Sequence, residues 1–212
     1  MLDYQQQFIQ YALDCGVLKF GEFQLKSGRI SPYFFNTGLF NSGAQLDKLG
    51  QFYAQALIAA GVEVDVLYGP AYKGIPLVST TAIAYSRLKG DIPFAFNRKE
   101  AKDHGEGGML VGAPLKGKVW ILDDVITAGT SVRESVDIIR AAGATVSGVV
   151  IALDRQEKGR NELSAVQEVS AQFGIPVIAI ISLANIVEFI EQSDASSEKL
   201  AIIKTYRQKF GV

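Results

Sequence analysis

Several features that mark other classes of protein are scarce in this chain of 212 residues. It holds one cysteine, Cys15, so no intrachain disulfide can form, and with only one histidine, His104, it lacks the side chains for a zinc site. No stretch has the length and apolarity of a membrane span, and residues 1–5 lack the basic start of a secretory signal. A net charge of −1 argues against bulk attraction to nucleic acid. We therefore expect a cytoplasmic protein whose partners include neither membrane nor nucleic acid.

What the chain does contain is a regular alternation of apolar segments, in a composition that is 48% hydrophobic and 20% charged. This predicts a single domain over residues 1–212, with an α/β fold and a mostly parallel, doubly wound sheet. The hydrophobic periodicity predicts strands at 64–68, 93–96, 118–123, 145–153 and 177–181, and helices at 3–15, 44–60, 74–89, 131–142, 161–173 and from the last strand to the end. Residues 1–40, which include an expected hairpin of 17–25 and 30–36, fall outside the alternation and are expected to form a small hood.

The most informative motif is the run from Val119 to Ser131, V-W-I-L-D-D-V-I-T-A-G-T-S. Its apolar part predicts a buried parallel strand, and ligands bind at the carboxyl ends of such strands. Asp123 and Asp124 stand there side by side. Adjacent residues of a strand point to opposite faces, so the two carboxylates are expected to reach different partners, such as a ribose diol and a metal-bound water.

The turn that follows, from Thr127 to Ser131, has the composition of a phosphate cradle. Backbone N–H groups at a helix start attract anions, and Gly129 lets the backbone come close to one. Ser131 and Glu134 have the spacing of a capping box, which predicts a helix start at Ser131. The alternative is a solvated strand end followed by an ordinary helix cap.

Two further segments carry positive charge. The turn 69–76, G-P-A-Y-K-G-I-P, places Lys73 between two glycines after a strand, and it is either a second anion site for pyrophosphate or an ordinary turn with a solvated lysine. The polar segment 97–108 carries Arg98, Lys99, Lys102 and His104 among glycines. It is either a solvated surface or, as we expect, a flexible loop that closes over a polyanion.

Two candidates concern a planar substrate. Phe34 and Phe35 follow the polar turn of the predicted hairpin and would stack a flat base, unless they are a core aromatic pair. Arg155 follows the expected strand 145–153 and would bind a carboxylate in a bidentate manner, through two of its guanidinium nitrogens, unless it is an ordinary surface arginine.

Together these motifs resemble those of the type I phosphoribosyltransferases and, within them, the orotate phosphoribosyltransferases, over nearly the whole chain. The resemblance implies catalytic roles for Lys102, Asp123 and Asp124. It implies contacts with orotate from Phe34, Phe35, Thr127 and Arg155. It implies contacts with the donor, phosphoribosyl pyrophosphate, from Lys26, Tyr72, Lys73, Arg98, Lys99, Lys102, His104, Asp123, Asp124, Val125, Ile126, Thr127, Ala128, Gly129, Thr130 and Ser131.

The resemblance also implies a homodimer whose loop residues reach the neighbouring subunit's site, and a requirement for Mg²⁺. No direct protein ligand is expected for the metal, which the substrate would hold, with Asp123 or Asp124 acting through water. The implied reaction makes orotidine 5′-monophosphate and pyrophosphate in de novo pyrimidine synthesis. Two alternatives stay open: a transferase for another base such as a purine, and a regulator that senses the donor and binds nucleic acid or protein.

Overall fold

A six-stranded sheet forms the centre of the protein in a computed structural model, which describes all residues except 26, 103–107, 128, 160–161 and 194–197, and no side chains at 101, 102 and 108. The strand order is β5-β4-β3-β6-β7-β8, and every neighbouring pair is parallel except β4–β5. The strands are β3 (Val66–Gly69), β4 (Phe94–Lys102), β5 (Gly108–Gly112), β6 (Lys118–Leu122), β7 (Thr145–Asp154) and β8 (Val177–Ser182). The predicted mostly parallel sheet is confirmed.

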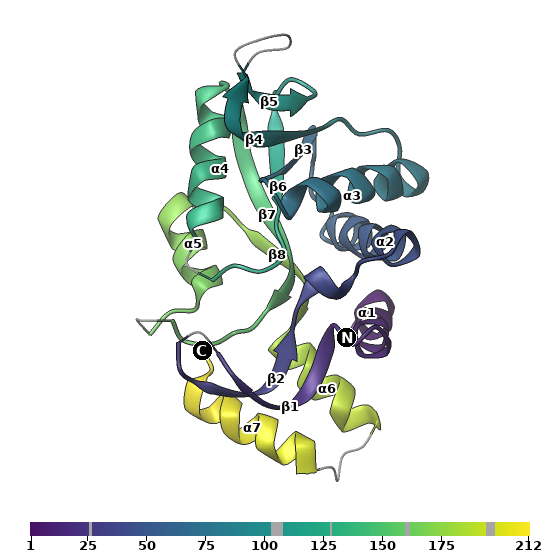
Figure 1. Cartoon of the computed structure of the whole chain (residues 1–212), viewed down its shortest axis with the longest axis vertical. Helices are drawn as coiled ribbons and strands as arrows, with labels where there is room; N and C mark the ends of the chain where they lie inside the picture. Colours follow the sequence, from purple (N-terminus) through teal and green to yellow (C-terminus); the bar gives the residue numbers. More distant parts are fainter. Residues whose placement is uncertain (26, 103–107, 128, 160–161, 194–197) are drawn as a thin grey trace.

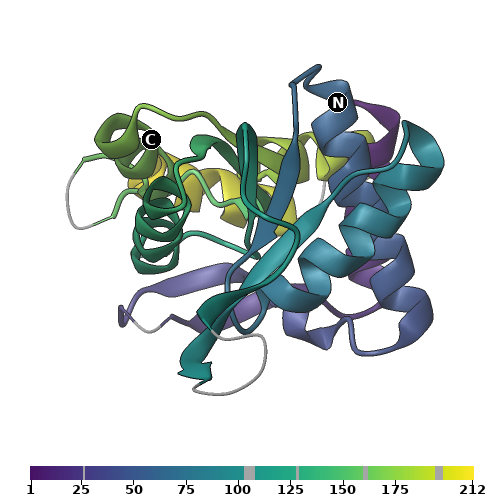
Figure 2. The same cartoon turned by 90° about the horizontal axis from the view of Figure 1, so that it is seen from above.

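Helices cover both faces of this sheet (Figures 1 and 2). On one side lie α1 (Asp3–Asp14), α2 (Gly43–Ala59) and α3 (Gly74–Leu88), and on the other lie α4 (Thr130–Ala141) and α5 (Ala165–Phe173). Each face has its own apolar core, because the central strands bury residues on both sides. Within the described residues no helix is both long and apolar enough to cross a lipid bilayer.

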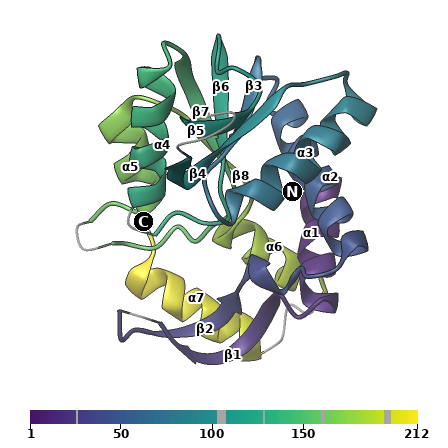
Figure 3. The ribbon, with the colours of Figure 1, turned by 45° about the horizontal axis from the view of Figure 1, so that its top comes forward.

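The hood hairpin consists of β1 (Leu18–Gln24) and β2 (Ile30–Phe35), which pair in antiparallel fashion. It lies at one end of the molecule beside α6 (Leu183–Ser193) and α7 (Glu198–Phe210), as Figure 3 shows. A short 3-10 helix, η1 (Thr37–Leu39), connects the hairpin to α2. The hood therefore packs on the last helices of the chain.

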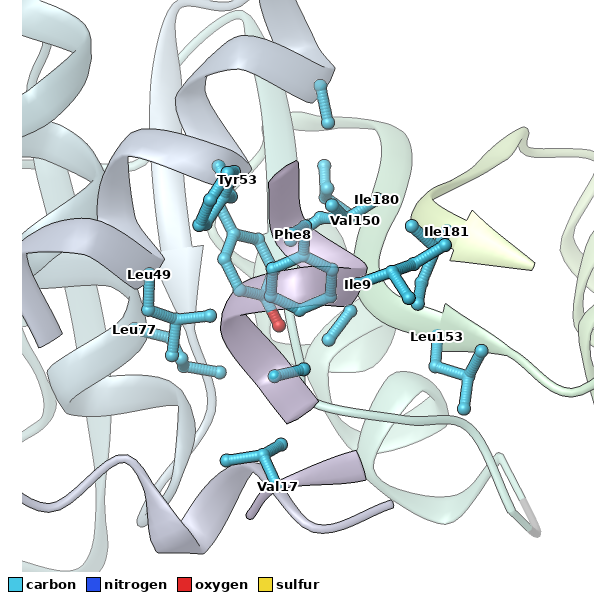
Figure 4. Close-up of a cluster of buried hydrophobic side chains, with 14 of the residues drawn as sticks. Phe8, Ile9, Val17, Leu49, Tyr53, Leu77, Val150, Leu153, Ile180 and Ile181 are labelled. Atoms are coloured by element: carbon cyan, nitrogen blue, oxygen red, sulfur yellow. The ribbon is translucent and has the colours of Figure 1, made fainter. Parts of the chain in front are cut away.

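The larger core fixes the first helix to the sheet (Figure 4). Phe8 is fully buried, and its ring lies 5.0 Å from that of Phe52 in an edge-to-face arrangement. Ile180 and Ile181 of β8 are also fully buried in this cluster. Burying one such side chain stabilises a protein by about 1.5–3 kcal/mol, so this cluster holds the hood and the strand ends in fixed positions.

The structure corrects three local predictions. The segment 97–108 is not a loop throughout, because β4 continues to Lys102 and β5 begins at Gly108; only 103–107 lie outside the described residues. The capping box at Ser131 is wrong: α4 begins at Thr130 after Gly129, whose φ is 68° and which makes no side-chain cap. The helix predicted from 161 starts at Ala165, because Ser164 and Gln167 form a capping box there.

Candidate active site at the carboxyl ends of β3 and β6

The polar candidates meet where the strand order reverses. After β3 the chain continues to β4 on one side, and β6 pairs with β3 on the other. The connections that follow β3 and β6 therefore diverge to opposite sides of the sheet, which opens a crevice at their carboxyl ends. Lys73 follows β3 and the two aspartates follow β6, so the topology brings these predicted residues together.

A cavity of about 230 Å³ lies at the end of β6. The left-handed backbone of Gly129 turns the chain into α4, so the first N–H groups of that helix, which have no partner within it, lie at this turn. The cavity is lined by Asp123, Val125, Ile126, Thr127, Gly129, Thr130, Ser131 and Val132. Ala128, predicted to belong here, lies outside the described residues. Backbone donors, hydroxyls and a helix N-terminus suit a phosphate monoester.

Asp123 lines this cavity and is only 8% exposed. Burial and then the neighbouring Asp124 raise the pKa of its carboxyl to about 6, although a hydrogen bond from Ser131 opposes the shift. Its carbonyl oxygen accepts a 2.8 Å hydrogen bond from the buried Tyr53 hydroxyl of α2. The backbone of Asp123 is thus fixed by Tyr53. Just below neutral pH, part of the protein molecules carry a proton on the Asp123 carboxyl.

Asp124 connects three separate parts of the chain. Its Oδ2 accepts hydrogen bonds from Lys73 Nζ at 2.7 Å and from the Thr37 hydroxyl of the hood at 3.2 Å, and its Oδ1 accepts one from the Val125 N–H at 2.8 Å. The two aspartates therefore contact different partners. Thr37 was missed by the sequence analysis, because a lone threonine before a helix carries no signal of such a role.

The turn after β3 is closed by two glycines. A Cβ added at Gly69 would lie 2.1 Å from the carbonyl oxygen of Gly74, so a side chain does not fit there. The neighbouring side chains are open to solvent: Tyr72 is 70% exposed and the Lys73 side chain 63%. The peptide bond between Ala71 and Tyr72 is cis. This turn holds its backbone close together and presents a lysine towards the crevice.

Asn97 is a second residue that the sequence analysis did not single out. It is 7% exposed in β4, and its Oδ1 accepts hydrogen bonds from the Tyr68 hydroxyl and the Ala71 N–H, both at 2.9 Å. Its Nδ2 donates to the Arg98 carbonyl oxygen at 3.1 Å. A polar residue directly after the apolar start of β4 was the signal available in the sequence, and its side chain fixes the turn that carries Lys73.

The structure describes only some of the basic residues of 97–108. Arg98 and Lys99 belong to β4, and the Lys99 ammonium lies 4.0 Å from Glu134 of α4. The backbone of Lys102 ends β4, but nothing is described of its side chain. His104 and the hairpin residue Lys26 lie outside the described residues. Their predicted contacts with the donor stay predictions.

Phe34 and Phe35 occupy different surroundings, because neighbours in a strand point to opposite faces. Phe35 packs against the larger core, with its ring 6.3 Å from that of Phe8. Phe34 instead pairs with Phe23 across the hairpin at 5.4 Å. A base stacked on the ring faces would therefore meet one of the two rings rather than both.

Arg155 is not an ordinary surface arginine, since its side chain is 24% exposed and its guanidinium lies 4.2 Å from the ring centre of Tyr33. Its Nε and Nη2 donate to Glu157 Oε1 at 3.1 and 2.8 Å, and Nη2 also donates to the Ser31 hydroxyl at 3.0 Å. Glu157 was not singled out in the sequence, where a glutamate two residues after an arginine carries no signal.

A larger cavity, of about 380 Å³, lies between the hood hairpin and α7. Its walls are mostly apolar, and neither aspartate of the β6 end contributes to it. We place the chemistry in the smaller cavity because the carboxylates, the hydroxyls and the helix N-terminus converge there.

A metal ion would find limited protein ligation at this site. Among the described residues no group of three or more histidine, cysteine, aspartate or glutamate side chains is arranged to hold an ion. Mg²⁺ is commonly held by one or two carboxylates together with substrate phosphates and water. Asp123 and Asp124, beside a cavity suited to phosphate, fit that mode of binding.

Comparison with known proteins decides which family this site belongs to. The family model for the phosphoribosyl transferase domain matches residues 39–177. Orotate phosphoribosyltransferases from Photobacterium profundum and Cronobacter sakazakii are 58% and 59% identical to this chain, each over the full length of both proteins. The chain belongs to the orotate phosphoribosyltransferases.

A solved structure of this family agrees with the architecture. The orotate phosphoribosyltransferase of Francisella tularensis is 46% identical, covers 97% of this chain and 100% of its own, and superposes with a TM-score of 0.89. The general transferase model begins in η1 and ends at the start of β8. It therefore spans the cavity at the end of β6 but leaves out the hood hairpin, α6 and α7, whereas the sequence matches to orotate phosphoribosyltransferases cover these residues too.

Proposed function

We propose that this protein transfers the ribose 5-phosphate group of phosphoribosyl pyrophosphate to orotate, which yields orotidine 5′-monophosphate and pyrophosphate in de novo pyrimidine synthesis. The observation that carries the proposal is the union of an acidic pair, a phosphate cradle and Lys73 at two adjacent strand ends. The full-length similarity to orotate phosphoribosyltransferases supports orotate as the acceptor.

We propose one orientation of the donor in this crevice. Its 5′-phosphate binds the turn from Thr127 to Ser131, where backbone donors and hydroxyls surround the cavity. Its ribose hydroxyls bind the carboxylates of Asp123 and Asp124, which precede that turn. Its pyrophosphate binds the turn with Tyr72 and Lys73, so Lys73 exchanges its contact with Asp124 for a phosphate oxygen.

The hard step is the breaking of the anomeric C–O bond. Positive charge develops on the ribose ring, and the two carboxylates stabilise it, while Lys73 and the cations of 97–108 stabilise the leaving pyrophosphate. Orotate attacks through its deprotonated N1, so no covalent enzyme intermediate is needed. Removing one such preorganised donor costs on the order of 3 kcal/mol of barrier reduction.

Mg²⁺ is part of the proposal. Substrate oxygens would hold most of the ion, and Asp123 or Asp124 would contact it through water. When bound, the ion neutralises the pyrophosphate. We also propose a homodimer in which Arg98, Lys99, Lys102 and His104 reach the partner's site, and a location in the cytoplasm.

A pyrophosphate-release assay with purified protein, donor and Mg²⁺ tests this function. Orotate is expected to support turnover, whereas adenine, hypoxanthine and guanine are not. Turnover with a purine and none with orotate would overturn the choice of acceptor and keep the donor site. Salt-dependent binding to an oligonucleotide, with no turnover on any base, would point to a regulator instead.

A further inference from the structure

A buried carboxylate stands at the centre of the contacts around Arg155. The side chain of Glu157 is 8% exposed, and besides the Nε and Nη2 of Arg155 it accepts hydrogen bonds from the Tyr33 hydroxyl at 2.9 Å and from Arg29 Nη1 at 3.4 Å. We call Arg29, Tyr33, Arg155 and Glu157 the acceptor cluster. In this cluster the guanidinium groups of Arg29 and Arg155 both contact the carboxylate of Glu157, so the positively charged groups outnumber the carboxylate.

The backbone between the two charged residues is shaped to bring them together. Gln156 has a φ of 50°, a left-handed backbone conformation that residues other than glycine seldom adopt. It is held from three sides: its N–H donates to Asp154 Oδ1, its Oε1 accepts from the Ala184 N–H, and its carbonyl oxygen accepts from the Val212 N–H. This turn places Arg155 and Glu157 in one cluster.

The far side of the cluster is closed by the C-terminal residues. The Lys158 N–H donates to the Phe210 carbonyl oxygen at 2.8 Å, and Glu157 forms a β-bridge with Gly211. The guanidinium of Arg29 lies 4.4 Å from the ring centre of Phe210. The segment that carries Arg155 is therefore fixed by the hood on one side and by the end of α7 on the other.

The charges of the cluster do not cancel. Burial raises the pKa of the Tyr33 hydroxyl well above its ordinary value, so that residue is neutral at physiological pH. One carboxylate, that of Glu157, then faces the guanidinium groups of both Arg29 and Arg155. The remaining positive charge in a half-buried place favours an anionic ligand.

We propose that Glu157 is a positioning residue for the acceptor: it holds Nε and Nη2 of Arg155, with Nη2 also donating to the Ser31 hydroxyl, so that Nη1 is directed to the carboxylate of orotate. This proposal rests on the proposed function, in which Arg155 contacts orotate. A planar guanidinium binds a carboxylate well only in a fixed orientation, because both groups are flat and directional. Selection of an anionic pyrimidine is then shared between Arg155 and the residue that orients it.

A double-mutant cycle in the orotate transferase reaction tests the proposal, with Arg155→Ala, Glu157→Ala and the double variant. Glu157→Ala is expected to raise the KM for orotate about tenfold, a factor that corresponds to about 1.4 kcal/mol. The KM for phosphoribosyl pyrophosphate should stay within about twofold. The double variant should be no worse than Arg155→Ala alone, because Glu157 acts through Arg155.

Glu157→Gln serves as the conservative variant, since it keeps an acceptor oxygen without the charge, and its orotate KM should lie between those of the wild type and Glu157→Ala. If Glu157→Ala fails to fold, the cycle is run with Glu157→Gln. Glu162→Gln is the matched control, because this carboxylate pairs with Lys158 close by in the sequence and is 86% exposed; both KM values should be unchanged. Thermal unfolding of every variant confirms that it is folded.

The outcomes distinguish a failure of the positioning role of Glu157 from a failure of the proposed function. Additive effects in the cycle, equal rises in both KM values, or an unchanged orotate KM in the Glu157 variant used would overturn the positioning role while Arg155→Ala still impairs orotate use. An Arg155→Ala variant with an unchanged orotate KM, or a wild-type protein inactive on orotate, would instead overturn the proposed function on which the role depends.

Discussion

The donor end and the acceptor end of the proposed active site are built in different ways. The donor cavity is lined by residues 123–132, which are almost contiguous, and its main groups are backbone donors at the start of α4. The acceptor cluster joins Tyr33 to Glu157, which are 124 positions apart, and adds a contact with the C-terminal segment. A contiguous site can be changed by one local substitution, whereas an assembled one depends on the packing of hood, sheet and α7 together.

The largest expected effect is at the donor end. Lys102→Ala should lower kcat on the order of 10²–10³-fold, because a cation that meets the leaving pyrophosphate acts mainly in the transition state. The KM for orotate should change little. Steady-state kinetics with each substrate varied in turn measure both, and Lys89→Ala, beyond the end of α3, is the control. Unchanged kcat would remove the segment 97–108 from the mechanism.

Asn97→Ala is expected to have an intermediate effect, limited to the donor. It leaves the buried hydroxyl of Tyr68 without its acceptor, at a cost of about 1–3 kcal/mol, and it removes the acceptor of the part-buried Ala71 N–H as well. The turn with Lys73 then loosens, so the KM for phosphoribosyl pyrophosphate should rise about tenfold, which corresponds to about 1.4 kcal/mol, with the orotate KM unaffected.

Asn97→Asp separates the two functions of that side chain, because it keeps the acceptor oxygen for Tyr68 and Ala71 but replaces the donor to the Arg98 carbonyl with a buried carboxylate oxygen. It should retain a donor KM closer to that of the wild type than Asn97→Ala does. Equal rises in the KM for donor and acceptor in Asn97→Ala would show that the two ends of the site are not independent.

The smallest effect concerns stability. The pKa of Asp123 is raised to about 6, so the folded protein keeps a proton that the unfolded chain loses near pH 4. Stability from this group is complete below pH 4 and is lost as pH rises through about 6. Asp123→Asn removes the cost of burying the charge, so above pH 7 the variant should be more stable than the wild type by about 1–3 kcal/mol.

Denaturant unfolding at pH 4 and pH 8 measures this difference, which should vanish at the lower pH. The same variant should bind the donor more weakly above pH 7, because the ribose loses a charged partner. A variant that is less stable than the wild type at pH 8 would contradict the raised pKa.

The acidic pair at the end of β6 and the residue Arg155 were singled out in the sequence, but the contacts that hold Arg155 were not. An apolar strand followed by Asp123, Asp124 and a glycine-containing turn is a local pattern, and strand topology then fixes where it lies. Glu157, Thr37 and Asn97 act through side chains that meet distant partners. No periodicity marks such contacts, because they depend on how the hood and the helices pack.

The turn that carries Lys73 and the strand end at Asp123 are also linked through a glycine, at the contact between α2 and α3. Gly50 of α2 packs against α3 so closely that an added Cβ would lie 2.5 Å from the Thr80 carbonyl oxygen. Helix α3 starts directly after Lys73, and α2 carries Tyr53, which holds the Asp123 carbonyl. This close packing therefore fixes the distance between Lys73 and Asp123, for which we propose contacts with the pyrophosphate and with the ribose. A methyl group at this one crossing would force the two helices apart, and with them Lys73 and the Asp123 carbonyl.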